Sequence, residues 1–272
     1  MNEIVDIGLG SLAASYLLLI LPLAILLYLR VPMLKETGIA VVRMTVQLLF
    51  VGFYLQVVFR LNHAWLNLGW VLVMIGVADG SILRGCRLNV RRFVAPLFVA
   101  LLAGTLIPVL AFVGPLLRRP VWLDAQYVIP LTGMVLGNCL RADIIGLKTF
   151  YTGIVRGEKA YHQSLAQSAR LHEALLPYFR EAMQAALLPT VASMATIGLV
   201  ALPGMMTGVI LAGADPITAI KYQIAIMIAI FSGTATTVFL AIWLTVKNSF
   251  NAYGVLDLAV FRLQPVFNGA SV

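Results

Sequence analysis

Seven apolar runs, each about 20 residues long, divide this chain and constrain its fold more than any other feature. Runs of this length match the hydrocarbon thickness of a bilayer, where every backbone amide must be satisfied within the protein. The sequence therefore predicts an all-α integral membrane protein with about seven transmembrane helices in a single domain over residues 1–272. The expected spans are roughly 7 to 28, 37 to 59, 65 to 83, 93 to 117, 125 to 146, 186 to 211 and 221 to 246.

The composition excludes a soluble domain, because 61% of the residues are hydrophobic and only 11% are charged. The net charge of +8 does not indicate nucleic-acid binding, since the Lys and Arg residues lie in short clusters between apolar runs. Most of these bases fall on one side if the N-terminus is outside. The other side then carries only Arg60, Arg118, Arg119 and Lys221. The bias predicts an N-out, C-in topology.

One apolar run, Ala195 to Gly213, is interrupted in its middle by the segment Leu202 to Gly208, which reads LPGMMTG. A membrane helix tolerates such a break where neighbouring protein or a water-filled cavity satisfies the freed backbone groups. The interruption therefore favours a transport protein over a membrane anchor.

A long connection from Gly146 to about Ala185 lies on the predicted cytoplasmic side. Within it, Glu158 to Leu176 is predicted to form one amphipathic helix that ends at Pro177. Two interpretations remain open. The helix could be a linker resting on the membrane surface, or a coupling element that docks in a groove of a partner protein.

Several polar side chains are expected at membrane depth. Arg43 and Gln47 share one helix face by their spacing of four residues. A further group falls in the cytoplasmic half of the bilayer: Asp79, Asn138, Arg141 and Asp143. Such residues either face a substrate pathway or serve the structure, by pairing across helices or by extending to the headgroups.

Small residues recur in three GxxxG pairs, Gly76/Gly80, Gly133/Gly137 and Gly204/Gly208, for which helix packing is the default interpretation. Met205 and Met206 are predicted to pack or gate rather than to hold metal, because adjacent helical residues point about 100° apart. No His cluster, CxxC motif or P-loop is present, so the chain is not expected to be an enzyme or to bind ATP itself.

Three blocks of the sequence carry a resemblance to a known family. They are the run from Met194 to Ile228 around LPGMMTG, the run from Arg43 to Phe53, and the run from Ile129 to Cys139. Together they resemble the FetB (YbbM, UPF0014) family of membrane permeases, over nearly the whole chain. The family often has Ala-Leu-Gly-Ala where this chain reads Ala166-Gln167-Ser168-Ala169.

The resemblance implies the permease subunit of an ABC exporter for iron or a related metal ion in the bacterial inner membrane. It also implies a homodimer, a separate FetA-like ATP-binding subunit that supplies ATP and Mg, and no cofactor on this chain. The loop 146–185 becomes the coupling loop, with contacts expected at Glu158, Tyr161, Leu165, Ala169, His172 and Leu176. The candidate path or gating residues are Arg43, Gln47, Asp79, Asn138, Pro203, Gly204, Met205 and Met206.

An alternative is an ion-coupled secondary transporter or channel for small solutes without an ATPase. Secondary transporters often carry paired broken helices in repeated halves, and the sequence offers no convincing second copy of the LPGMMTG segment.

Overall fold

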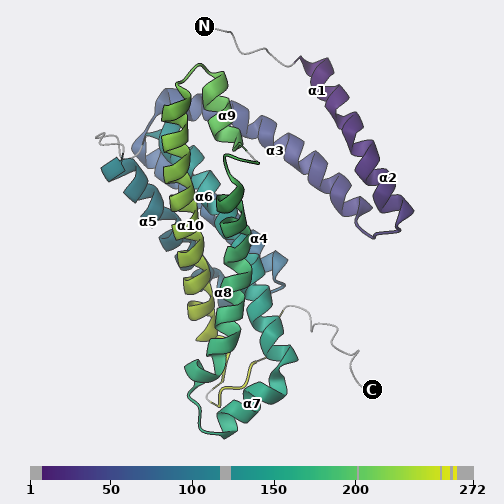
Figure 1. Cartoon of the computed structure of the whole chain (residues 1–272), viewed down its shortest axis with the longest axis vertical. Helices are drawn as coiled ribbons and strands as arrows, with labels where there is room; N and C mark the ends of the chain where they lie inside the picture. Colours follow the sequence, from purple (N-terminus) through teal and green to yellow (C-terminus); the bar gives the residue numbers. More distant parts are fainter. Residues whose placement is uncertain (1–7, 117–123, 201, 252, 258–259, 262–272) are drawn as a thin grey trace.

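The computed structural model describes residues 8–116, 124–200, 202–251, 253–257 and 260–261, and these are nearly all helical (Figure 1). The first elements are α1 (Leu9–Ser15), the 3-10 turn η1 (Tyr16–Leu19), α2 (Ile20–Tyr28) and α3 (Leu34–Leu61). They are followed by α4 (Ala64–Gly85), α5 (Val90–Ala111), the π-turn η2 (Phe112–Leu116) and α6 (Ala125–Arg156). The last are α7 (Glu158–Ala166), α8 (Leu171–Thr196), α9 (Gly204–Leu211) and α10 (Pro216–Val246).

A central bundle of α4, α5, α6, α8 and α10 holds the main hydrophobic core. Within it, α5 crosses α10 at very short range, where Gly104 meets Gly233. A Cβ atom on Gly104 would lie 2.9 Å from the carbonyl oxygen of Gly233, and one on Gly233 would lie 2.6 Å from that of Gly104. Only glycine allows the two backbones to approach so closely.

The GxxxG pairs do not mark close contacts inside the described part of the chain. An added Cβ atom would meet nothing within 4 Å at Gly76, Gly80, Gly137, Gly204 or Gly208. At Gly133 it would meet only the terminal methyl group of Met74, at 3.3 Å. Within the described part of one chain, helix packing is therefore supported only at Gly133, and the closest helix crossing uses Gly104 and Gly233 instead.

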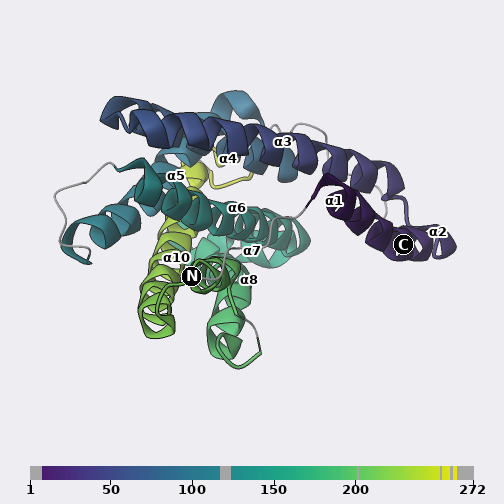
Figure 2. The same cartoon turned by 90° about the horizontal axis from the view of Figure 1, so that it is seen from above.

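An N-terminal arm, made of α1, η1, α2 and α3, projects from the side of the bundle (Figures 1 and 2). The only buried residue that α3 shows in the described chain is Val58, which joins Ala125 and Ile129 of α6 in a small separate core. Nearby, Tyr54 stacks on Trp70 of α4 with ring centroids 4.0 Å apart. Near the middle of α3, the hydroxyl groups of Thr45 and of Tyr16 in η1 hydrogen-bond at 2.5 Å. The arm thus touches the bundle at one end only.

Six helical segments in the described residues are long and apolar enough to cross a membrane: Gly10–Tyr28, Leu34–Leu61, Ala64–Gly85, Val90–Gly114, Ala125–Arg156 and Pro216–Val246. The remaining expected span, 186 to 211, is divided between α8 and α9. These two helices and the segment between them run alongside α10 (Figure 1). The structure therefore divides the remaining expected span into two helices.

The interruption lies earlier in the chain than the sequence predicted. Helix α8 ends at Thr196, and α9 begins at Gly204 with Pro203 as its N-cap residue. Gly198 adopts a φ of +84°, a conformation that side-chain-bearing residues rarely adopt. Gly204 and Gly208 are helical, so only Leu202 and Pro203 of the LPGMMTG motif belong to the break.

The segment 146–185 is mostly an extension of two long helices rather than a loop. The prediction of one helix from Glu158 to Leu176 is wrong, because α7 ends at Ala166 and α8 starts at Leu171. Ser168, with a φ of 68°, turns the chain, and the backbone amide of Arg170 donates a hydrogen bond to the Glu173 carboxylate at 2.7 Å at the start of α8. Pro177 lies inside α8, which continues through it, and Ala182 and Ala186 of this helix are buried.

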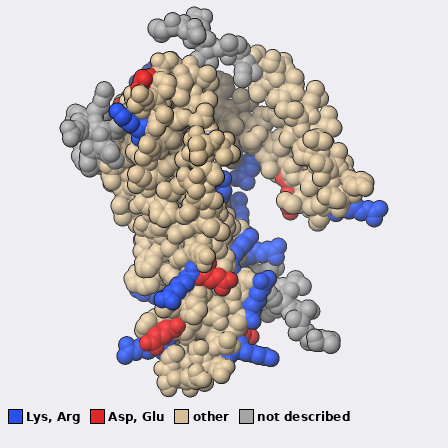
Figure 3. Space-filling view, in the orientation of Figure 1, with Lys and Arg blue, Asp and Glu red and all other residues tan. Residues whose placement is uncertain are grey.

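Charged side chains gather at the end of the bundle that carries α7, and few Lys, Arg, Asp or Glu side chains show on the surface above it (Figure 3). At this charged end, the chain after α10 returns across the bundle. Its Asp257 forms an ion pair with Arg92, with a nitrogen–oxygen distance of 2.5 Å. The backbone amide of Asn89 donates a hydrogen bond to the carbonyl oxygen of Val260.

Candidate functional site

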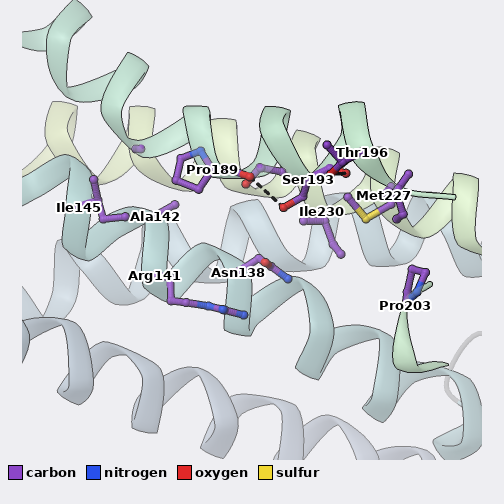
Figure 4. A pocket seen from close by; sticks show the side chains of 13 residues that line it. Asn138, Arg141, Ala142, Ile145, Pro189, Ser193, Thr196, Pro203, Met227 and Ile230 are labelled. Carbon is purple, nitrogen blue, oxygen red and sulfur yellow. Dashed lines mark hydrogen bonds between the residues drawn. The ribbon is translucent and has the colours of Figure 1, made fainter. Parts of the chain in front are cut away.

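A cavity of about 430 Å³, here called the lateral cavity, lies between α6, α8 and α10 and reaches the break before α9. Asn138 and Arg141 of α6 lie on one side, with Pro189, Ser193 and Thr196 of α8 across from them (Figure 4). Met227 and Ile230 of α10 and Pro203 complete the labelled lining. The interrupted span and the polar residues of α6 thus meet at one cavity.

The two polar side chains of α6 each bond to their own helix. Asn138 Nδ2 donates to the carbonyl oxygen of Met134 at 2.8 Å, and Arg141 Nε donates to that of Gly137 at 3.3 Å. These bonds leave the Asn138 carbonyl oxygen and the terminal guanidinium nitrogens of Arg141 available. Arg141 is exposed and contributes the positive charge of the lining.

A row of hydroxyl groups on α8 lines the opposite wall, from Thr190, Ser193 and Thr196. Ser193 donates to the carbonyl oxygen of Pro189 at 2.9 Å, and Thr196 donates to that of Ala192 at 3.0 Å. Because their hydrogens bond to the helix backbone, these oxygens present lone pairs to the cavity. The wall can therefore accept hydrogen bonds from a bound molecule or its hydration water.

A second cavity, of about 420 Å³, lies on the other side of the break and shares Ile197, Pro203 and Met227 with the first. Its remaining lining is apolar except for Gln223 of α10. Met206 is buried and borders this cavity, as the packing role predicted for it suggests, whereas the side chain of Met205 lies outside the described residues. The break therefore separates a polar cavity from an apolar one.

Only part of the predicted path set meets at the lateral cavity. Asn138 and Pro203 line it, and Gly204 starts the adjoining helix. Arg43 and Gln47 are exposed on the arm, and Asp79 is buried within the bundle. The predicted path set did not include Arg141, which the sequence placed at membrane depth, or the hydroxyl row, for which the spacing of Thr190, Ser193 and Thr196 at three residues was the available signal.

The two intramembrane carboxylates belong to the core rather than to the cavity. Asp143 is 0% exposed, and neither of its oxygens has a geometrically defined hydrogen bond among the described residues. Thr237 is close enough to interact with Asp143, although its hydroxyl donates to the carbonyl oxygen of Thr234 at 3.1 Å. Neither Asp79 nor Asp143 forms an ion pair with an arginine in the described chain. Pairing of these carboxylates with arginines across helices, one of the interpretations left open by the sequence, is therefore not found among the described residues.

The described residues contain no group of three or more His, Cys, Asp or Glu side chains that could hold a metal ion. The polar groups that line the lateral cavity are one guanidinium, one amide and several hydroxyls. Hard metal ions prefer carboxylate and carbonyl oxygens, and softer ones prefer imidazole or thiolate. The wall is therefore poorly suited to binding a bare metal ion tightly.

At the charged end, the apolar face of α7 packs on the protein's own C-terminal segment. The buried Tyr161 hydroxyl donates to the carbonyl oxygen of Gly254 at 2.6 Å, and Leu165 contacts the same glycine. Burial, with a smaller contribution from Tyr178, raises the pKa of Tyr161 to about 12, so the hydroxyl keeps its donor proton. Of the expected coupling residues, Glu158, His172 and Leu176 remain exposed, and Ala169 is half-buried.

Comparisons with known proteins show which family the chain belongs to. The model of the family described as "Uncharacterised protein family (UPF0014)" matches residues 9–250. The chain belongs to the UPF0014 family. A relative named "UPF0014 membrane protein slr1647", from Synechocystis, is 35% identical over 72% of this chain and 76% of its own length. No solved structure matches the chain significantly.

One relative in the UPF0014 family has a functional name. The "Probable iron export permease protein FetB" of Escherichia coli is 30% identical over 89% of this chain and 92% of its own length. "Protein ALUMINUM SENSITIVE 3" of Arabidopsis thaliana is 34% identical over 69% of this chain and 67% of its own length. The resemblance found in the sequence is confirmed, and with it a multi-pass membrane protein.

Proposed function

We propose that this chain is the permease subunit of an ATP-driven exporter that moves iron, or a related metal, out of the cytoplasm across the bacterial inner membrane. The name of the Escherichia coli relative supports the direction and the cargo. A cavity at an interrupted span supports a transport role, because irregular backbone at membrane depth usually lines a pathway.

The observation that carries this proposal is the continuity of α8. This helix has 26 residues, which corresponds to about 39 Å, and it starts at the charged end and reaches the lateral cavity at Pro189 to Thr196. A force applied at its first turn would therefore reach the cavity through one continuous helix. Such an arrangement suits a transporter whose pathway is moved by a partner in the cytoplasm.

The partner we propose is a FetA-like ATPase that binds ATP and Mg, with two copies serving a homodimer of this chain. Its docking surface is the linking tip, the exposed turn of Ala166, Gln167, Ser168 and Arg170 between α7 and α8, with Leu176 beside it. The tip is a better docking surface than the face of Tyr161 and Leu165, which the C-terminal segment covers. The weak attachment of the N-terminal arm is consistent with further contacts to a second copy.

The proposal is tested by purifying the tagged chain with its ATPase and measuring metal accumulation in inside-out vesicles with and without ATP. Ala166→Trp at the linking tip is expected to abolish stimulation of ATPase activity while membrane insertion stays normal. Tyr253→Trp is the matched control, since Tyr253 is 86% exposed at the same end and is not one of the tip residues. Flux that survives ATP depletion, with no ATPase copurifying, would instead establish an ion-coupled transporter or channel.

A further inference from the structure

The cargo chemistry can be inferred from the charge of the lateral cavity, and this inference rests on the proposed function because it assumes that the cavity lies on the transport path. Arg141 is the charged residue of the lining. Ion pairs in the described chain join Arg92 to Asp257 and His162 to Glu158, so Arg141 has no carboxylate partner there. An unpaired guanidinium at membrane depth is costly unless water or an anion accompanies it.

The chain's own intramembrane carboxylates are turned away from this cation. Asp143 lies about 160° around α6 from Arg141, at about 100° per residue, whereas Asn138 lies only about 60° away. Asp143 is 0% exposed and Asp79 is 1% exposed, and neither lines the cavity. The positive charge of the cavity is therefore not neutralised from within the bundle.

A second basic residue, Arg43, lies on the face of α3 that contacts the bundle. Arg43 and Gln47 share a face of α3 with Tyr54 and Val58, all within about 60°. Tyr54 and Val58 touch the bundle, so this face is the inner face of the arm. Arg43 lies about 22 Å along α3 from Val58. Val58 contacts Ile129 and Ala125 of α6, and Arg141 lies about 18 to 24 Å along α6 from these two residues. Figure 3 shows basic side chains where the bundle faces the arm.

We propose that the lateral cavity binds an oxyanion, a carboxylate or a phosphate, either alone or as the chelator that carries the metal ion. The planar guanidinium of Arg141 can donate two parallel hydrogen bonds to such a group. Asn138 and the lone pairs of Ser193 and Thr196 suit the hydroxyl groups or bound water of a chelator. A bare cation would meet a positive charge and no anionic ligand.

The test measures equilibrium binding to the purified full chain in nanodiscs, without ATP or ATPase. The probes are citrate, ferric citrate, inorganic phosphate and Fe²⁺ in chelator-free buffer. Citrate or ferric citrate is expected to bind, and Arg141→Gln is expected to weaken binding about tenfold or more, with Arg141→Lys in between. Arg156→Gln is the matched control, because Arg156 is exposed at the end of the same helix.

The probes also separate the two sources of the oxyanion. Equal binding of citrate with and without iron, in competition with phosphate, would identify a free anion, whereas binding of ferric citrate alone would identify a chelate. Either result supports the proposal. Binding of Fe²⁺ alone with an affinity that Arg141→Gln leaves unchanged would overturn it, as would no binding of any oxyanion. ATP-driven export of bare iron by the Arg141→Gln variant would overturn the inference and leave the proposed function standing.

Discussion

The hydroxyl group of Tyr161 in α7 donates a hydrogen bond to the carbonyl oxygen of Gly254, 93 residues further along the chain. This contact fixes α7 to the returning C-terminal segment. The same segment is joined to the start of α5 by the ion pair of Arg92 with Asp257. The end of the bundle that is proposed to meet the ATPase is therefore held together by long-range contacts.

Tyr161→Phe removes this hydrogen bond and leaves a buried carbonyl oxygen unpaired. We expect a loss of stability of about 1 kcal/mol. Thermal unfolding of the purified protein measures the effect, with Tyr253→Phe as the control because Tyr253 is 86% exposed. Equal midpoints for the two variants would show that the Tyr161 hydroxyl contributes nothing to the folded state.

The linking tip contains a side-chain-bearing residue in a left-handed conformation. Ser168 has a φ of 68°, at the position where the family often has glycine. Ser168→Gly should relieve a cost of about 1–2 kcal/mol, partly offset by the extra freedom of glycine in the unfolded chain. We expect a net stabilisation of up to about 1 kcal/mol in thermal unfolding. Ser164→Gly, inside α7, should lower the stability of the protein instead. A loss of stability in both variants would contradict the backbone strain assigned to Ser168.

The crossing of α5 and α10 depends on two glycines. Gly104→Ala would place a methyl group against the side chain of Thr237 and 2.9 Å from the carbonyl oxygen of Gly233, so the helices would have to separate. Overpacking of this kind typically costs about 1–3 kcal/mol. Gly80→Ala is the control, since nothing lies within 4 Å of its added methyl group. If both variants unfolded at the same temperature as the wild type, this crossing would not be closely packed.

Patterns along the sequence were sufficient for the class of fold, because membrane helices depend on long apolar runs that can be read directly. They did not locate the helix breaks. Pro177 resembles a helix end in sequence, yet α8 continues through it, whereas the turn at Ser168 has no strong local signal. The break in the interrupted span begins at Ile197 rather than at Leu202, since Gly198 already leaves the helical conformation.

The site was harder to predict, because periodicity gives a helix face but not the neighbour that covers it. Tyr161 and Leu165 were expected to face a partner, and the C-terminal segment covers them instead. Depth alone also grouped Asp79 with Asn138, although one is in the core and the other lines the cavity. Three-dimensional packing was needed to separate such residues.

That separation gives a final prediction for α6, whose polar residues divide between two faces. Asn138→Leu is nearly isosteric and removes the amide from the lateral cavity. Transport should fall while stability stays within about 1 kcal/mol of wild type, because the amide's hydrogen bond is to its own helix. Asp143→Asn should behave in the opposite way. Its neutral amide suits a site with 0% exposure, so stability should be equal or higher and transport unchanged.

Vesicle flux and thermal unfolding of the same two preparations compare the faces directly. If Asp143→Asn abolished transport while its unfolding midpoint stayed normal, the buried carboxylate would take part in the transport cycle, and the division into a cavity face and a core face would be wrong. If Asn138→Leu left transport intact, the lateral cavity would lie off the pathway. The two variants thus test the two faces independently, because their side chains point about 140° apart around the same helix.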